Sequence, residues 1–138
     1  MKHRAVIQWA GLTLLAAAQA FAHHSFAAEF DDKKPIALSG SVVKVDWMNP
    51  HIWIYLDTKD EKGATTRWQC EGSAPNSLVR QGWTRDALKP GDQVSIEGFR
   101  SKDGSNTCNS RMVRLPDGRR VFGGSADDGG PNAGKSKQ

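Results

Sequence analysis

The chain has 138 residues, 25% of them charged, and a formal net charge of +4 at pH 7. Lys2 and Arg4 lie in a predicted leader that has no acidic residue, so removal of that leader lowers the net charge to +2. Positive and negative side chains are mixed along the rest of the chain, which argues against a nucleic-acid-binding protein. The 116 residues that follow residue 22 suit one compact domain rather than two.

Residues 1–22 are predicted to be a signal peptide. They begin with basic residues, continue with an apolar run over 5–18 and end in Ala20-Phe21-Ala22, which fits the A-x-A cleavage rule. The apolar run is shorter than the roughly 20 residues needed to cross a bilayer. We therefore expect a periplasmic or secreted protein without membrane insertion after cleavage. A cut after Ala20 is the alternative, and it makes His23 the third residue.

A cut after Ala22 makes His23 the first residue of the mature protein and His24 the second. The α-amine released by the cut has a reference pKa of about 8, so it can bind a metal ion together with the ring nitrogen of His23. Nitrogen-rich ligand sets of this kind favour Cu(II). The alternative is that both histidines are ordinary polar residues on a frayed terminus. Residues 23–35 are predicted to form an irregular arm.

Three strands are predicted after the arm. The first covers 36–47, the second covers 51–57 after the Asn49-Pro50 turn, and the third covers 64–71 after a hairpin loop. The second strand alternates with period two and therefore has two distinct faces. The predicted core face carries Ile52, Ile54 and Leu56. The predicted outer face carries His51, Trp53, Tyr55 and Asp57.

Beyond the third strand the pattern changes and then returns to strands. The predicted segments are a helix over 73–80, a turn over 83–88, and strands over 93–100, 107–115 and 119–122. This order predicts an all-β protein with one short helix, in which residues 36–122 form a small OB-like barrel of five to six strands. The tail, residues 123–138, has almost no apolar residue and is predicted to be disordered.

Cys70 and Cys108 are the two cysteines of the chain. An even pair in an exported protein predicts a disulfide, and in an OB-like barrel the two strands that carry them can be neighbours. Closing a loop of about 38 residues stabilises the fold by roughly 3 to 4 kcal/mol on the chain-entropy estimate. The alternative, thiolate metal ligands, lacks a CxxC spacing.

The Asn49-Pro50-His51 turn is the second candidate contributor to a metal site. His51 is predicted at the rim of the barrel, with Met48 and Trp47 close by in sequence. If the arm folds back, His51 adds a third nitrogen to the amine and ring nitrogen of His23, Met48 offers the soft sulfur that Cu(I) prefers, and Trp47 can shield the ion. The alternative for His51 is a surface or capping residue. The hypothesis is a copper-binding protein whose ligands are His23, His24, His51 and Met48.

A rival hypothesis is a binding module without catalytic activity. OB barrels often bind ligands on the sheet that contains the second and third strands, and Trp53 and Tyr55 on its outer face suit a saccharide, a peptide or a protein partner. Packing of both rings under the arm or the helix is the alternative. We expect no enzymatic activity, because the sequence has no Gly-rich phosphate loop, no HExxH and no recognisable Ser-His-Asp pattern. Another periplasmic protein is a possible partner.

Four local patterns stand out together. They are the mature start His23-His24-Ser25-Phe26, the Asn49-Pro50-His51 turn with Trp53, the step Gly82-Trp83-Thr84 and the turn Pro90-Gly91-Asp92. Together they resemble a family of small exported proteobacterial proteins of unknown function. The resemblance covers nearly all of the mature chain, and the Asn-Pro-His motif is its specific part. It implies a signal peptide and one β-rich domain but no activity, so the copper hypothesis depends on the ligands of this chain alone.

Overall fold

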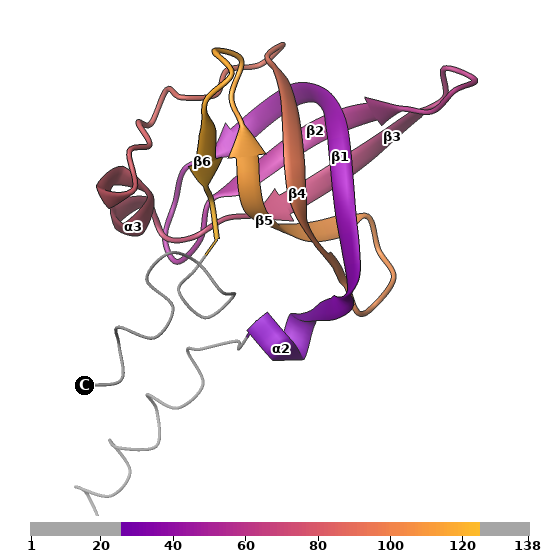
Figure 1. Ribbon diagram of the computed structural model, residues 1–138, viewed down its shortest axis with the longest axis horizontal. Coiled ribbons are helices and arrows are strands. Elements are labelled where there is room, and N and C mark those ends of the chain that lie inside the picture. Colours follow the sequence, from indigo (N-terminus) through magenta and orange to yellow (C-terminus); the bar gives the residue numbers. More distant parts are fainter. Residues whose placement is uncertain (1–25, 125–138) are drawn as a thin grey trace, which may run out of the picture.

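The computed structural model describes residues 26–124, which form a small barrel of strands with two short helices (Figure 1). The elements in chain order are α2 (Phe26–Glu29), β1 (Phe30–Asp46), β2 (Trp53–Lys59), β3 (Thr65–Glu71), α3 (Pro75–Arg80), β4 (Gln93–Ser101), β5 (Thr107–Arg114) and β6 (Arg120–Phe122). The predicted signal peptide, His23, His24 and the tail from residue 125 onward lie outside the described residues. Across residues 26–124, no helix is long and apolar enough to cross a bilayer.

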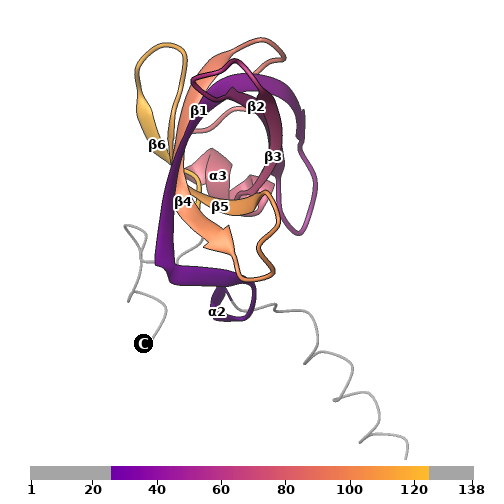
Figure 2. The ribbon, with the colours of Figure 1, turned by 90° about the vertical axis from the view of Figure 1, so that its right-hand side faces the viewer.

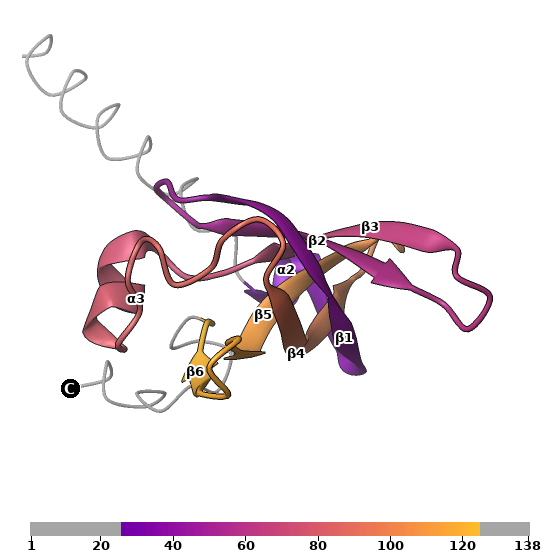
Figure 3. The same cartoon turned by 90° about the horizontal axis from the view of Figure 1, so that it is seen from above.

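The six strands form one sheet in the order β3-β2-β1-β4-β5-β6, and neighbours in this order are antiparallel. A short parallel pairing of β3 with β5 closes the sheet into a ring (Figure 2). The helix α3 connects β3 to β4 and lies at one end of the barrel, whereas the β2–β3 hairpin extends from the other end (Figure 3). The structure therefore confirms the predicted all-β, OB-like barrel of five to six strands.

The interior of the ring is filled by side chains from alternate strand positions. Ile52, Ile54 and Leu56 are fully buried, as the period-two pattern predicts. Trp83, which follows α3, is also buried, and its indole Nε1 donates a hydrogen bond to the carbonyl oxygen of Phe122 at 3.0 Å. The alternate residues of β2 face outward and are therefore not part of the core.

The predicted disulfide is confirmed. Cys70 of β3 and Cys108 of β5 are partners in the parallel pairing, their sulfurs are bonded, and both side chains are fully buried. The covalent bond therefore lies at the place where the ring of strands closes.

The first strand begins earlier than predicted. β1 starts at Phe30 rather than at Ile36, and residues 26–29 of the predicted irregular arm form α2. Phe30 is buried and pairs with Ser101, but the register shifts between Phe30 and Pro35. A proline lacks the N–H that forms hydrogen bonds between strands, so Pro35 predicts a boundary of the strand. The predicted start at Ile36 is therefore too late.

The ordered domain also extends past the predicted last strand. Gly123 is buried, its N–H donates to the carbonyl oxygen of Arg111 at 2.9 Å, and its own carbonyl accepts from the N–H of Ser73 at 2.8 Å. The first residue of the predicted disordered tail is therefore part of the packed domain, because it bridges β5 and the segment before α3.

Candidate functional site

The outer face of the sheet carries polar and aromatic side chains in rows that cross three strands. Trp53 of β2 lies between Asp46 of β1 and Glu71 of β3. The next row comprises Lys44, Tyr55 and Gln69. His51 lies two residues before Trp53, the first residue of β2, so alternation brings its side chain to the same face.

His51 is held by two hydrogen-bond acceptors on one ring nitrogen. Its Nδ1 lies 3.1 Å from the carbonyl oxygen of Gly72 and 3.1 Å from Oε1 of Glu71. A carbonyl oxygen and a carboxylate oxygen both require a donor, so Nδ1 carries a hydrogen and the lone pair of the neutral ring is at Nε2. The side chain is 39% exposed. In the neutral ring, Nε2 is therefore the nitrogen that can accept a hydrogen bond or bind a metal ion.

The backbone around His51 continues the β2–β3 ladder. The N–H of Gly72 donates to the carbonyl of Ile52 at 2.9 Å, and the N–H of Ile52 donates to the carbonyl of Ser73 at 3.2 Å. These bonds fix the position of His51 relative to Glu71. Glu71 was not predicted as a site residue, although the short β2–β3 hairpin loop was a signal that could have placed it opposite Trp53.

The residues before His51 have different surroundings. Met48 is 53% exposed, whereas Trp47 packs against the hydrophobic core. Within the part of the chain that the structure describes, no group of three or more His, Cys, Asp and Glu side chains is arranged to hold a metal ion. Of the three histidines predicted as ligands, His51 lies within the described residues, and His23 and His24 lie outside them.

The two aromatic residues predicted to share a ligand face have different surroundings. Lys44 Nζ lies 4.2 Å above the ring centre of Tyr55, where it also donates to Asp46 at 2.7 Å. The hydrogen bond to Asp46 raises the pKa of Lys44. Trp53 instead faces a groove of about 540 Å³. Trp53 therefore borders this groove, and a cation lies over the ring of Tyr55.

The Trp53 groove lies between α2, the outer face of the sheet and the β4–β5 connection. Ala28 and Glu29 of α2 form one side, Trp53 another, and Gln69 and Thr107 lie between them. The groove was not predicted as such, because α2 was read as irregular chain.

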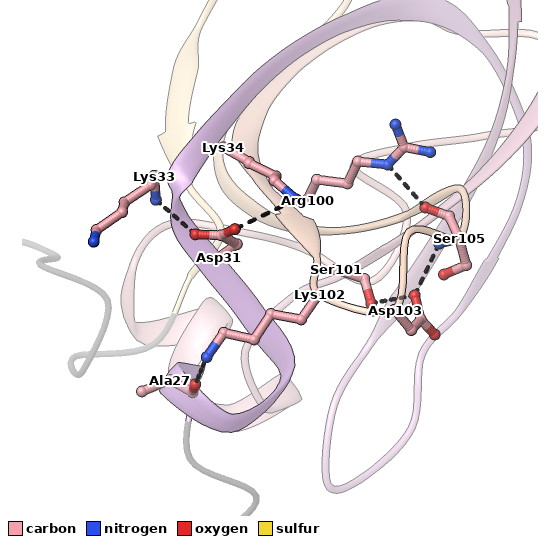
Figure 4. A network of polar contacts seen from close by, with 9 residues as sticks. All are labelled: Ala27, Asp31, Lys33, Lys34, Arg100, Ser101, Lys102, Asp103 and Ser105. Carbon is pink, nitrogen blue, oxygen red and sulfur yellow. Dashed lines mark hydrogen bonds and ion pairs between the residues drawn. The ribbon is translucent and has the colours of Figure 1, made fainter.

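Contacts of Lys102 hold α2 in place beside this groove, and Figure 4 shows the contact of its side chain with Ala27. The Nζ of Lys102 donates to the carbonyl oxygen of Ala27, and the backbone N–H of Lys102 donates to the carbonyl of Glu29 at 2.9 Å. On the other side of α2, the ring of Phe26 packs against Phe30 and Phe99, with centroid distances of 5.6 and 5.7 Å. The point from which the preceding chain departs is therefore fixed.

Asp103 stabilises the β4–β5 connection, which carries Lys102 and thereby the contacts with α2. Its carboxylate accepts hydrogen bonds from the hydroxyl of Ser101 at 2.6 Å and from the N–H of Ser105 at 2.8 Å. Hydrogen bonds from the side chain of Ser101 and from the side chain and backbone of Ser105 lower the pKa of Asp103 to about 2. The carboxylate is thus ionised at neutral pH and stabilises the turn that carries Lys102.

Comparison with known proteins identifies a family but no activity. Residues 12–110, more than half of the chain, match the model of DUF6152, a family of unknown function. No curated protein matches the chain. The resemblance to proteins of unknown function is confirmed to this extent, and their exported, proteobacterial character stays a prediction.

Proposed function

Because the chain belongs to DUF6152, a family of unknown function, we propose a role from its own residues: it is an exported protein that binds and carries copper. The ligands are the mature N-terminal His23, with its amine and ring nitrogen, His24, and Nε2 of His51. Met48 adds a thioether ligand when the ion is Cu(I). The same site stores or delivers the ion without catalysing a reaction, and another periplasmic protein is the natural recipient.

The observation that carries this proposal is the orientation of His51. Histidines that bind metals usually donate their second ring N–H to a carboxylate or a backbone carbonyl, which fixes the tautomer and makes the ligating nitrogen more basic. His51 has both kinds of acceptor at 3.1 Å on Nδ1, from Glu71 and Gly72. A histidine that only covered the surface would not need two acceptors on the same nitrogen.

The position of α2 supports participation of the N-terminus. Ala28 of α2 and Trp53 line one groove, and Trp53 is two residues from His51 on the same face. His23 precedes Phe26, the first residue of α2, by three residues, which can span at most about 11 Å. The helix α2 therefore brings the start of the described chain to the side of the barrel that carries Trp53.

The disulfide is consistent with an exported location. A buried Cys70–Cys108 bond is typical of proteins that fold in an oxidising compartment. Together with the predicted signal peptide, it supports a periplasmic or secreted protein.

The test is a Cu(II) titration of the mature protein with an authentic His23 start, verified by mass spectrometry. We expect tight 1:1 binding. One extra residue ahead of His23 removes the terminal amine from the ligand set, and His51→Ala removes the third nitrogen, so each change weakens binding by about tenfold or more. Gln93→Ala, an exposed change on β4, is the control and leaves the affinity unchanged. Binding that is absent, or insensitive to both changes, contradicts the proposal.

A further variant tests the role of Glu71 as a positioning residue. Glu71→Gln replaces the carboxylate that faces Nδ1 of His51 and is expected to weaken Cu(II) binding by about tenfold. Glu97→Gln is the matched control, because Glu97 is exposed and pairs with Arg120 at 3.0 Å on another part of the sheet. Nitrogen-15 NMR of the imidazole reports the tautomer without any metal. If His51→Ala weakens binding and Glu71→Gln does not, His51 binds the ion without help from Glu71.

A further inference from the structure

We propose that the groove beside Trp53 is a binding site for a neutral saccharide. Its volume of about 540 Å³ lies within the range of small-molecule sites in proteins. Trp53 provides an aromatic surface at one side, and Gln69 and Thr107 provide polar groups between the walls. An apolar ring surface next to hydrogen-bonding groups matches a sugar ring, which has C–H faces and a rim of hydroxyls.

Two polar side chains of the groove, Gln69 and Thr107, can form hydrogen bonds with a ligand. Nε2 of Gln69 donates to Oγ1 of Thr107 at 3.0 Å, and the hydroxyl of Ser105 donates to the same oxygen at 2.9 Å. A hydroxyl has two acceptor lone pairs and one hydrogen, so Thr107 has used both lone pairs and keeps its hydrogen to donate. Oε1 of Gln69 remains beside it as an acceptor. An adjacent donor and acceptor suit a ligand hydroxyl, which both accepts and donates.

The groove is rigid on two sides. Gln69 and Thr107 are partners in the parallel pairing of β3 and β5, and the next pair along is the disulfide Cys70–Cys108. The opposite wall, α2, is held by the bonds of Lys102 to the carbonyls of α2. A site that is already ordered loses little conformational entropy on binding, which favours affinity for a small ligand.

The charged groups near the groove favour a neutral ligand. Asp103 is ionised, but its oxygens accept hydrogen bonds from Ser101 and Ser105 of its own turn. The ammonium of Lys102 donates to Ala27. Glu29, the third charged residue of the lining, also interacts within the protein. The uncharged polar and aromatic groups of the lining include the amide of Gln69, the hydroxyl of Thr107 and the indole of Trp53. A peptide strand is disfavoured because β3 and β5 already pair with each other at this place.

The experiment uses the mature protein kept copper-free by a chelator, so that its result is independent of metal binding. Cellotriose, maltotriose and chitotriose are added at millimolar concentrations, and two-dimensional NMR follows the indole N–H of Trp53 and the side-chain amide of Gln69. We expect at least one trisaccharide to shift both signals in a saturable way. No shift with any of the three overturns the proposal.

Two variants locate the site. Thr107→Val removes the hydroxyl at nearly constant volume and is expected to raise the dissociation constant about tenfold. Thr58→Val is the matched control, because the hydroxyl of Thr58 donates to the carbonyl of Thr66 at 3.3 Å, on the hairpin outside the groove. Gln69→Ala alters an exposed side chain and repeats the test if Thr107→Val fails to fold. Unchanged affinity in a folded groove variant overturns the assignment.

Discussion

Single polar side chains order much of the surface near the candidate sites. His51 acquires a defined tautomer from Glu71 and Gly72, and the β4–β5 connection acquires its shape from Asp103. Both cases depend on acceptor oxygens that meet donors at hydrogen-bonding distance. The main effect of a charged side chain here is to orient the group that it contacts, because exposed ion pairs by themselves add little stability.

Replacement of Asp103 by Asn is expected to make stability less sensitive to acid. The pKa of Asp103 is about 2 in the folded protein, below its ordinary value of 3.8. The ionised carboxylate therefore stabilises the fold fully above pH 3.8, and this contribution is lost as the pH falls through about 2. Thermal denaturation at pH 7, 3 and 2 should show Asp103→Asn less stable than wild type at pH 7, with the gap closing toward pH 2. Asp32→Asn, at an exposed carboxylate, is the control, and a gap that persists at pH 2 contradicts this account.

The long strand β1 belongs to both halves of the barrel. Residues 35–41 pair with β4 and residues 40–46 pair with β2, so the strand bends where the two pairings overlap. Gly40 lies at this overlap, and a Cβ built there would stand 2.3 Å from the carbonyl oxygen of Asp57. Only a residue without a side chain permits the two backbones to approach this closely.

We expect Gly40→Ala to destabilise the protein by about 1 to 3 kcal/mol, the usual range for overpacking in a tight site. Urea denaturation followed by tryptophan fluorescence measures the change. Ala37→Ser, at an exposed position of the same strand, is the control and should lie within about 0.5 kcal/mol of wild type. Equal stability of the two variants would show that β1 can relax away from β2 at no cost.

At the scale of the whole molecule, the barrel depends on one short junction. The parallel pairing of β3 with β5 contains three residue pairs, and the disulfide is the middle one. Domains of this size bury a modest core, so a covalent bond at the junction is a large share of the total stability. The same bond holds the strands that carry Gln69 and Thr107.

Removal of the disulfide in Cys70→Ala/Cys108→Ala is expected to lower the free energy of unfolding by about 4 kcal/mol, because the bond spans 38 residues. Chemical denaturation of the oxidised protein, the reduced protein and the double variant measures the effect. A reducing agent should destabilise the wild type and leave the double variant unchanged. If reduction has no effect on the wild type, the junction is stable without its covalent bond.

Several features follow from neighbouring residues and were therefore predictable. The alternation of Ile52, Ile54 and Leu56 fixes which side of β2 is buried, and the turn residues between strands give the order of elements. The even pair of cysteines, together with the predicted signal peptide, predicted the disulfide. In each case the information lies in local periodicity, residue type or number, which does not depend on how distant strands meet.

Other features depend on contacts that form only when the barrel closes. The acceptors of His51 come from the end of β3, and the wall of the Trp53 groove comes from a helix that local pattern did not reveal. Lys44 lies over the ring of Tyr55 because β1 and β2 meet in one particular register. Register and closure are set by packing summed over residues far apart in the chain. The amino-acid sequence alone therefore determined the class of fold and the candidate ligand types, and tertiary structure decided which of them stand together.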